Sequence, residues 1–291
     1  MRPRLVTFLN EISPVSVFNW LVPTPNQMYA ITFLVVAIVF YKRSRQSRFP
    51  GQVVITTIWL GGIGAFLGAK LLFVLLHLKS YLILPSHIFA AGGSVSFGAY
   101  AGALIVLTVY LRYRKEPVLT SLDIAAATLP LGTALGRLSC LLNGDDFGKL
   151  TNAVWGVRYP QGSYPFAEQV SRGLISPFDS LSLPVHPNQL YLAFNALLIF
   201  FVVSWVWKKY RGYPGVTISL YAILYCATRF GWEFFRDEPT RGFAGLIFPQ
   251  YVCLGIVMMA IPAAIHLARK YRLSKFSHHK FHSPITERIQ P

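Results

Sequence analysis

Residues 246–268 read LIFPQYVCLGIVMMAIPAAIHLA, a stretch without an aspartate, glutamate, lysine or arginine. An α-helix of about 20 such residues is long enough to cross a bilayer. Further apolar stretches that approach this length occupy roughly residues 27–41, 53–78, 92–111, 118–142, 187–207 and 215–235. The sequence therefore predicts an all-α integral membrane protein with about seven transmembrane helices, and we expect residues 1–291 to form a single transmembrane domain.

The composition favours a membrane protein over a water-soluble one. Of the 291 residues, 54% are hydrophobic and only 13% are charged, which is more apolar than a single soluble core requires. The formal net charge of +16 would suggest nucleic acid as a partner in a soluble protein. Because the basic residues lie in short runs between the apolar stretches, we expect membrane lipid as a partner and no nucleic acid.

The distribution of these basic residues predicts the orientation. Alternate connections are strongly basic, and they contain Lys42, Arg43, Arg45, Arg48, Arg112, Arg114, Lys115, Lys208, Lys209, Arg211, Arg269, Lys270, Arg272 and Lys275. Lysine and arginine are enriched in cytoplasmic loops. We therefore expect the N-terminus outside, the C-terminus in the cytoplasm with a basic tail at roughly 270–291, and a small extracytoplasmic head at roughly 143–186, where both signs of charge occur.

Three smaller features lead to further expectations. Alternation over 153–159 predicts a short strand in the head, and a short apolar piece at 81–91 is interfacial or re-entrant. The cysteines all lie in apolar stretches, so we expect free thiols at Cys140, Cys226 and Cys253. The histidines of the tail could suggest a metal site, but no carboxylate or cysteine lies nearby, so a tail that contacts anionic lipid is favoured.

Charged residues inside the apolar stretches suggest a buried anion site. Arg229 and Glu233 are four residues apart and share one face of the sixth predicted helix. Arg137 lies at a similar depth near the outer end of the fourth. Two guanidinium groups at one level repel each other unless an anion bridges them, and a phosphate accepts hydrogen bonds from arginine bidentately. The alternative is that each arginine reaches the interface or binds helix-end carbonyls.

Other polar residues in the apolar stretches have simpler explanations. Lys70 lies deep in the second stretch, where a salt bridge to Asp123 is the favoured interpretation. His186 precedes the fifth helix, with Pro187 at its first position, and is more typical of a local hydrogen-bonding residue than of a base. The glycine-rich run 92–102 favours close helix packing, although it could also admit a lipid head group.

Three motifs carry a family resemblance. They read GRLSCLLNG at 136–144, HPNQLY at 186–191 and RFGWEFFR at 229–236. In this order they resemble the bacterial prolipoprotein diacylglyceryl transferases, and the similarity runs from roughly Tyr29 to Gln250. The resemblance implies a multi-pass protein of the bacterial plasma (inner) membrane that moves diacylglyceryl from phosphatidylglycerol to the lipobox cysteine of a preprolipoprotein. It also implies seven helices with the N-terminus outside and a small head.

The resemblance also implies roles for individual residues. The expected catalytic residues are Arg137, Arg229, Glu233, Asp145 and His186. The expected substrate-binding residues are Tyr29, Asn143, Gln189, Tyr191, Arg236, Gln250 and Lys70. The arginines would stabilise the phosphate, Glu233 would orient Arg229, and the general base remains open among Glu233, His186 and Asp145. We expect no cofactor and no metal.

Departures from the family pattern leave a second function open. Phe97 stands where the family places a histidine or tyrosine, and it has no polar atom with which to act as an acid or base. Cys140 replaces a common asparagine, Asp145 a frequent glutamate, and Leu192 a usual glutamate. The alternative is a divergent paralogue that binds anionic phospholipid or a lipoprotein precursor without transfer or with altered specificity. Seven helices alone would also fit a transporter or a retinal-type receptor, although 246–268 has no lysine for a Schiff base.

Overall fold

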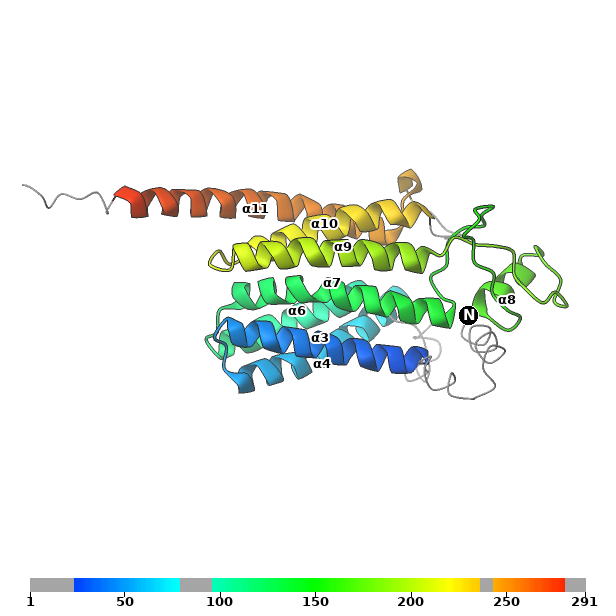
Figure 1. Ribbon diagram of the computed structural model, residues 1–291, viewed down its shortest axis with the longest axis horizontal. Coiled ribbons are helices and arrows are strands. Elements are labelled where there is room, and N and C mark those ends of the chain that lie inside the picture. Colours follow the sequence, from blue (N-terminus) through cyan, green and yellow to red (C-terminus); the bar gives the residue numbers. More distant parts are fainter. Residues whose placement is uncertain (1–23, 79–95, 236–242, 281–291) are drawn as a thin grey trace, which may run out of the picture. The chain divides into compact units, whose positions relative to one another are not determined.

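The computed structural model describes residues 24–78, 96–235 and 243–280. Within these ranges one long helix corresponds to each of the seven expected stretches (Figure 1). They are α3 (Pro25–Gln46), α4 (Gly51–Leu76), α6 (Ser96–Tyr113), α7 (Val118–Asn143), α9 (Asn188–Lys209), α10 (Val216–Trp232) and α11 (Phe248–Lys280). The prediction of an all-α protein is thereby confirmed for the described part of the chain.

Several of these helices can cross a bilayer. Four are long and apolar enough, namely α4, α7, α9 and the part of α11 up to Tyr271, and Phe97–Tyr113 is a shorter apolar helix. The chain is therefore a multi-pass membrane protein. Seven crossings with the N-terminus outside remain a prediction, and the segments 1–23 and 81–91 lie outside the described residues.

The chain divides into two compact units, which are described separately. In the unit 37–124, α4 and α6 pack against each other through glycines. A Cβ atom on Gly68 of α4 would lie 2.8 Å from the Cα atom of Gly102 on α6 and closer still to the carbonyl oxygen of Gly98. The close packing expected for the glycine-rich run is confirmed at Gly98 and Gly102, while 92–95 lies outside the described residues.

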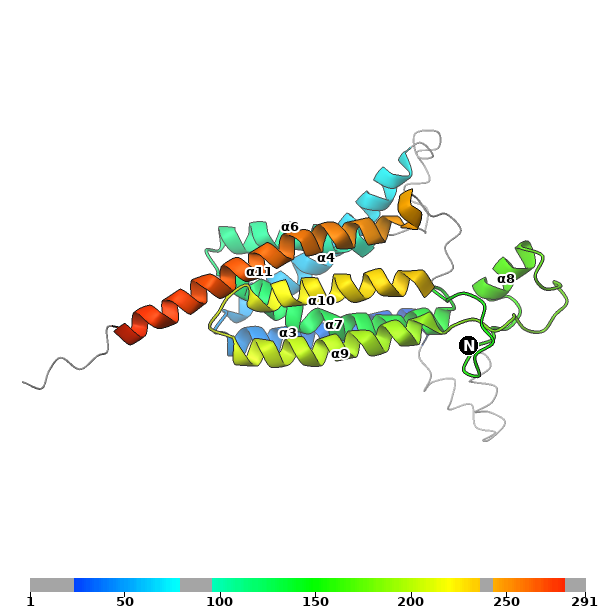
Figure 2. The ribbon, with the colours of Figure 1, turned by 90° about the horizontal axis from the view of Figure 1, so that it is seen from above.

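The other unit contains residues 125–291 and the start of α3. Its helix α10 packs against both α9 and α11, and these three run side by side in both views (Figure 1, Figure 2). A buried apolar cluster joins α7, α9 and α10, and it contains Ala126, Ile199, Val203 and Tyr221. The hydroxyl of Tyr271 donates to the carbonyl of Pro214 at 2.7 Å, so the α9–α10 connection and this part of α11 lie at the same end of the unit.

The connection between α7 and α9 forms a small lobe, the head. It has its own core of Phe147, Tyr159 and Val185 and one short helix, α8 (Tyr164–Ser171). The expected strand over 153–159 is wrong, because the amide of Gly156 donates to the carbonyl of Ala153 at 2.9 Å and closes a turn there. Within 153–159 only Val157 forms a β-bridge, an isolated antiparallel one to Val185, and Tyr159 exchanges hydrogen bonds with Ser182.

Other local expectations can be compared with the structure. Cys140, Cys226 and Cys253 are free thiols, as expected. Helix α9 begins at Asn188, so Pro187 is its N-cap rather than its first helical residue. Helix α11 continues to Lys280, through the first part of the segment expected to be a basic tail.

Candidate active site

A shallow hollow in the larger unit contains both arginines that the sequence singles out. Helices α7, α9 and α10 each contribute to its wall, which consists of Thr133, Arg137, Leu192, Asn195, Ala196, Tyr225, Thr228 and Arg229. Every charged residue of this wall is an arginine. The hollow therefore offers positive charge and hydrogen-bond donors to a ligand, as an anion requires.

Arg229 projects into this hollow from the last turn of α10. Its Nη2 atom donates to the Oε1 atom of Glu233 at 2.8 Å, and the side chains are 10% and 1% exposed. Spacing of four residues within a helix brings two side chains to the same face, so the pairing expected from the sequence is present. The ion pair uses one of the five N–H donors of the guanidinium, which leaves Arg229 able to bind a further acceptor.

Arg137 reaches the hollow from α7 and has a different carboxylate partner. Its Nη1 atom donates to the Oδ2 atom of Asp146 at 2.5 Å. Directly after α7 the backbone adopts positive φ at Gly144 (82°) and at Asp146 (55°). This tight turn folds the Asp146 carboxylate back towards the helix that it has just left. Asp146 was not among the residues expected in the site.

Further polar groups surround this turn. The Nδ2 atom of Asn143 donates to Oδ2 of Asp145 at 2.9 Å, and the hydroxyl of Tyr29, on α3, lies 3.8 Å from the sulfur of Cys140. Donor atoms of Cys140, Asp145 and Asp146 lie within 4.8 Å of one another and are of types that bind metals. Because Arg137 is paired with one of these carboxylates, a cation would meet a guanidinium there, and we interpret the cluster as a hydrogen-bonding one.

Two fully buried glutamines hold the site together. Gln189, in the first turn of α9, donates from Nε2 to the backbone carbonyl of Asp145 at 2.6 Å and to the hydroxyl of Tyr159 at 3.1 Å. Burial raises the pKa of Tyr159, the hydrogen bond from Gln189 offsets part of this rise, and the resulting pKa is about 12. The hydroxyl is therefore neutral at physiological pH. Gln250 accepts from the amide of Ile247 at 3.0 Å and donates to the carbonyl of Phe230 at 3.1 Å.

An aromatic cluster connects the head to α9 and α10. The Nε1 atom of Trp155 donates to the hydroxyl of Tyr191 at 2.7 Å, and that hydroxyl lies 3.1 Å from Nδ1 of His186. The ring of Tyr191 stacks on Trp232, with 5.6 Å between the ring centroids. Trp232 directly precedes Glu233, so the cluster reaches the helix end that carries Arg229.

Other residues that the sequence singles out belong to the other unit or lie outside the described residues. Lys70 belongs to the unit 37–124, where its Nζ atom lies 6.0 Å from the ring centroid of Phe73. Phe97 is half-buried on α6 in the same unit, and Arg236 lies outside the described residues. Asp123 is 5% exposed, and its pairing with Lys70 remains a prediction.

The structure also adds residues that sequence reasoning missed. Thr133, Asn195, Tyr225 and Thr228 line the hollow, and Trp155 and Trp232 flank Tyr191. A signal was present for Asn195, because an amide side chain in the middle of an apolar stretch calls for a polar partner. The hydroxyl residues and tryptophans give weaker signals, since they are common in membrane helices and at their ends.

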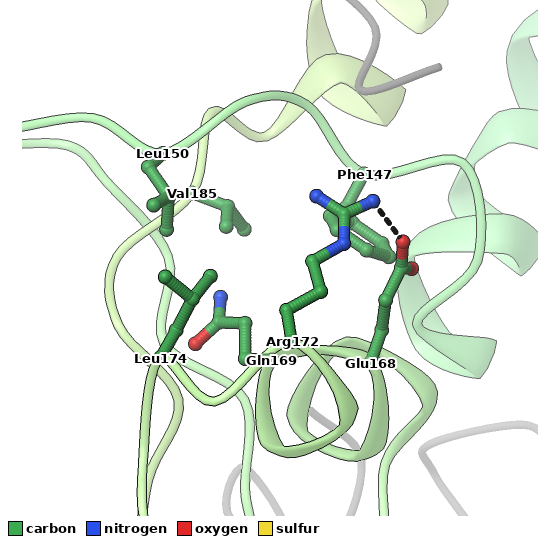
Figure 3. A pocket seen from close by; sticks show the side chains of 7 residues that line it. All are labelled: Phe147, Leu150, Glu168, Gln169, Arg172, Leu174 and Val185. Atoms are coloured by element: carbon green, nitrogen blue, oxygen red, sulfur yellow. Dashed lines mark hydrogen bonds and ion pairs between the residues drawn. The ribbon is translucent and has the colours of Figure 1, made fainter. Parts of the chain in front are cut away.

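A second small hollow lies within the head itself. Figure 3 shows its wall, which consists of Phe147, Leu150, Glu168, Gln169, Arg172, Leu174 and Val185. Arg172 forms an ion pair with Glu168 across one turn of α8. Gln169 exchanges hydrogen bonds with the backbone of Leu183. The wall of this hollow contains a carboxylate beside its one arginine, whereas the other hollow contains two arginines and no carboxylate, so the arginine-lined hollow is the better candidate for an anion site.

Comparisons with known proteins identify the family of this chain. A family model described as prolipoprotein diacylglyceryl transferase matches residues 25–266. A phosphatidylglycerol–prolipoprotein diacylglyceryl transferase of Pasteurella multocida is 28% identical over 88% of this chain and 87% of its own length. Proteins with the same name are 28% identical in Clostridium tetani, over 80% of this chain and 88% of their own, and in Campylobacter hominis, over 94% and 100%. The chain belongs to the prolipoprotein diacylglyceryl transferase family.

Proposed function

We propose that this chain transfers diacylglyceryl from phosphatidylglycerol to the lipobox cysteine of a preprolipoprotein in the bacterial inner membrane. The observation that carries the proposal is that Arg137 and Arg229, from two different helices, line one hollow. Each arginine has its own carboxylate partner, which limits the repulsion between the two before a ligand binds. A lipid phosphate can accept hydrogen bonds from both guanidinium groups.

The reaction exchanges one bond to the lipid glycerol for another. The cysteine thiolate attacks the carbon of the diacylglyceryl group that carries the phosphate. A carbon–sulfur bond forms there, the bond from this carbon to the phosphate oxygen breaks, and glycerol phosphate leaves. Negative charge grows on the departing phosphate, and the two guanidinium groups stabilise it there. The thiol must also lose its proton to a base for the sulfur to be an effective nucleophile.

The contacts favour Asp145 as the base among the three candidates. Glu233 is 1% exposed and bonded to Arg229, which suits an orienting role. The Nδ1 atom of His186 is engaged with Tyr191. Asp145 uses Oδ2 for the bond from Asn143, whereas its Oδ1 atom has no hydrogen-bond partner in the part of the chain that the structure describes. A carboxylate oxygen of this kind can accept the thiol proton.

The charges at the ends of the helices support a membrane orientation. Lys208 and Lys209 end α9, and its connection to α10 bonds to Tyr271, close to Arg269 and Lys270. These residues lie at the opposite end of the unit from the start of α9, where the head joins this helix. Because basic residues favour the cytoplasmic side, we place the head outside, with seven crossings and the N-terminus outside.

The test is transfer in cells depleted of their own transferase. Expression of the chain should give a lipoprotein precursor a diacylglyceryl thioether, detected by mass spectrometry of the modified peptide. Arg137→Ala and Arg229→Ala should each abolish the product, and full activity in either variant contradicts the phosphate-binding role.

The second candidate is a paralogue that binds lipid or precursor without transfer, which Phe97 favours because the family places a polar residue there. It predicts no product from the natural chain and a gain of product from Phe97→His.

A further inference from the structure

An asparagine lies beside the two arginines inside the hollow. Asn195 is on the third turn of α9, flanked in the wall by Leu192 and Ala196. Its Nδ2 atom donates to the Oγ1 atom of Thr228 at 3.0 Å, and this hydroxyl in turn donates to the carbonyl of Leu224 at 2.8 Å. Because polar side chains within a membrane helix are costly unless satisfied, an amide here needs a reason.

The bond to Thr228 fixes how the amide is presented. A carboxamide has two N–H donors and one acceptor oxygen, and Thr228 takes one of the donors. The Oδ1 atom of Asn195 is therefore left as an acceptor in a wall where the guanidinium groups can only donate. Thr228 directly precedes Arg229, so this acceptor is anchored to the residue next to the one that would hold the phosphate.

We propose that Asn195, held by Thr228, selects donor lipids whose head group carries hydroxyls beside the phosphate. The proposal rests on the proposed function, since it assigns the hollow to the donor lipid. A hydroxyl donates to Oδ1 of Asn195 while Arg137 and Arg229 bind the phosphodiester. A head group with an ammonium could also donate to that oxygen, but it would place a positive charge beside two guanidinium groups.

A matched pair of lipids isolates the contribution of the head-group hydroxyls. Phosphatidylglycerol and phosphatidylpropanol have the same charge and nearly the same head-group size, and they differ only in the two hydroxyls. We expect the natural protein in proteoliposomes to turn over phosphatidylglycerol about three- to tenfold better, which corresponds to one net hydrogen bond. Asn195→Leu, which keeps the branching at Cγ without the polar atoms, and Thr228→Val, which keeps the shape, should bring this ratio close to one.

A control variant separates this effect from a general loss of helix packing. Ser204 lies nine residues further along α9 and donates across to the carbonyl of Ala127 at 3.4 Å, away from the hollow. Ser204→Ala removes an interhelical hydrogen bond of the same kind, and it should leave the preference between the two lipids intact. An unchanged preference in Asn195→Leu overturns the proposal, and so does an equal loss of turnover with both lipids.

Failure of the transferase function itself is recognised separately. If the natural protein transfers from neither lipid, the proposed function is wrong, and selection is then measured by lipid retention in native mass spectrometry. Retention of phosphatidylglycerol over phosphatidylpropanol by the natural protein, and loss of this preference in Asn195→Leu, supports selection by Asn195. Equal retention of the two lipids by the natural protein contradicts it.

Discussion

Arg137 and Asp146 are nine residues apart and joined by a 2.5 Å ion pair, which closes the turn between α7 and the head. The bond holds a guanidinium of the hollow in place from outside the helix. Asp146→Asn keeps the shape and weakens the bond, so Arg137 should become less well placed for the phosphate. We expect transfer to fall about ten- to a hundredfold, the range that small misplacements cost, in a reconstituted assay.

The head supplies a matched control for this variant. Glu168 also pairs with an arginine, Arg172, on the exposed surface of α8. Exposed ion pairs contribute little to stability, so Glu168→Gln should leave transfer within about twofold of the natural rate. Equal losses in both variants would show that any missing carboxylate of the head impairs activity, and the specific role of Asp146 would be wrong.

Glu233→Gln tests the buried partner of Arg229. Glu233 is 1% exposed, and loss of one partner leaves a buried charge uncompensated, which costs about 3–5 kcal/mol. Thermal unfolding in detergent should show this destabilisation. Added phosphatidylglycerol should raise the melting temperature of the variant more than that of the natural protein, because its phosphate can replace the lost negative charge. An identical lipid effect in the two proteins would contradict a phosphate at Arg229.

Tyr191→Phe tests the junction between the head and the helices. The substitution removes the hydroxyl that accepts from Trp155 and contacts His186, and it retains the ring that stacks on Trp232. One net hydrogen bond is worth about 1 kcal/mol, so limited proteolysis should cut the head about fivefold faster. Tyr164→Phe, at a tyrosine that is 63% exposed on the head, is the control and should not change the rate.

Much of the architecture could be predicted because the thickness of the bilayer sets the length of apolar sequence that a crossing helix needs. Apolar stretches of a fixed length correspond to α4, α7, α9 and α11. The pairing of Arg229 with Glu233 follows from helix periodicity. A shared hollow for Arg137 and Arg229 could be anticipated because charges in membrane helices must find polar surroundings.

The missed features depend on backbone geometry that a hydropathy pattern does not contain. Asp146 reaches Arg137 because two positive-φ residues, Gly144 and Asp146, reverse the chain after α7. The contact of Trp155 with Tyr191 spans 36 residues through the irregular head. The expected strand failed for a related reason, since Gly156 closes a turn in the middle of an alternating pattern.

Tyr159 predicts a pH dependence of stability. Its pKa in the folded protein is raised to about 12, compared with about 10 in an unfolded chain. Its neutral form is therefore favoured by folding, and the associated stability is fully present below pH 10 and lost as the pH rises from 10 through 12. The difference in melting temperature between the natural protein and Tyr159→Phe should be constant below this window and shrink within it. A constant difference across the window would contradict burial of this hydroxyl.

Two glycines of α4 provide a paired test of its packing on α6. A Cβ atom on Gly68 would meet the backbone of α6, including the Cα atom of Gly102 at 2.8 Å, whereas the nearest atoms to one on Gly61 belong to the Leu107 side chain, at 3.5 Å or more. Backbone cannot move aside as a side chain can, so Gly68→Ala should lower the free energy of unfolding by about 1–3 kcal/mol. Gly61→Ala should instead be neutral or slightly stabilising, because alanine favours the helix over glycine by about 1 kcal/mol. Denaturation of both variants in detergent measures the difference. Equal stability of the two would mean that α4 and α6 are not held together at Gly68.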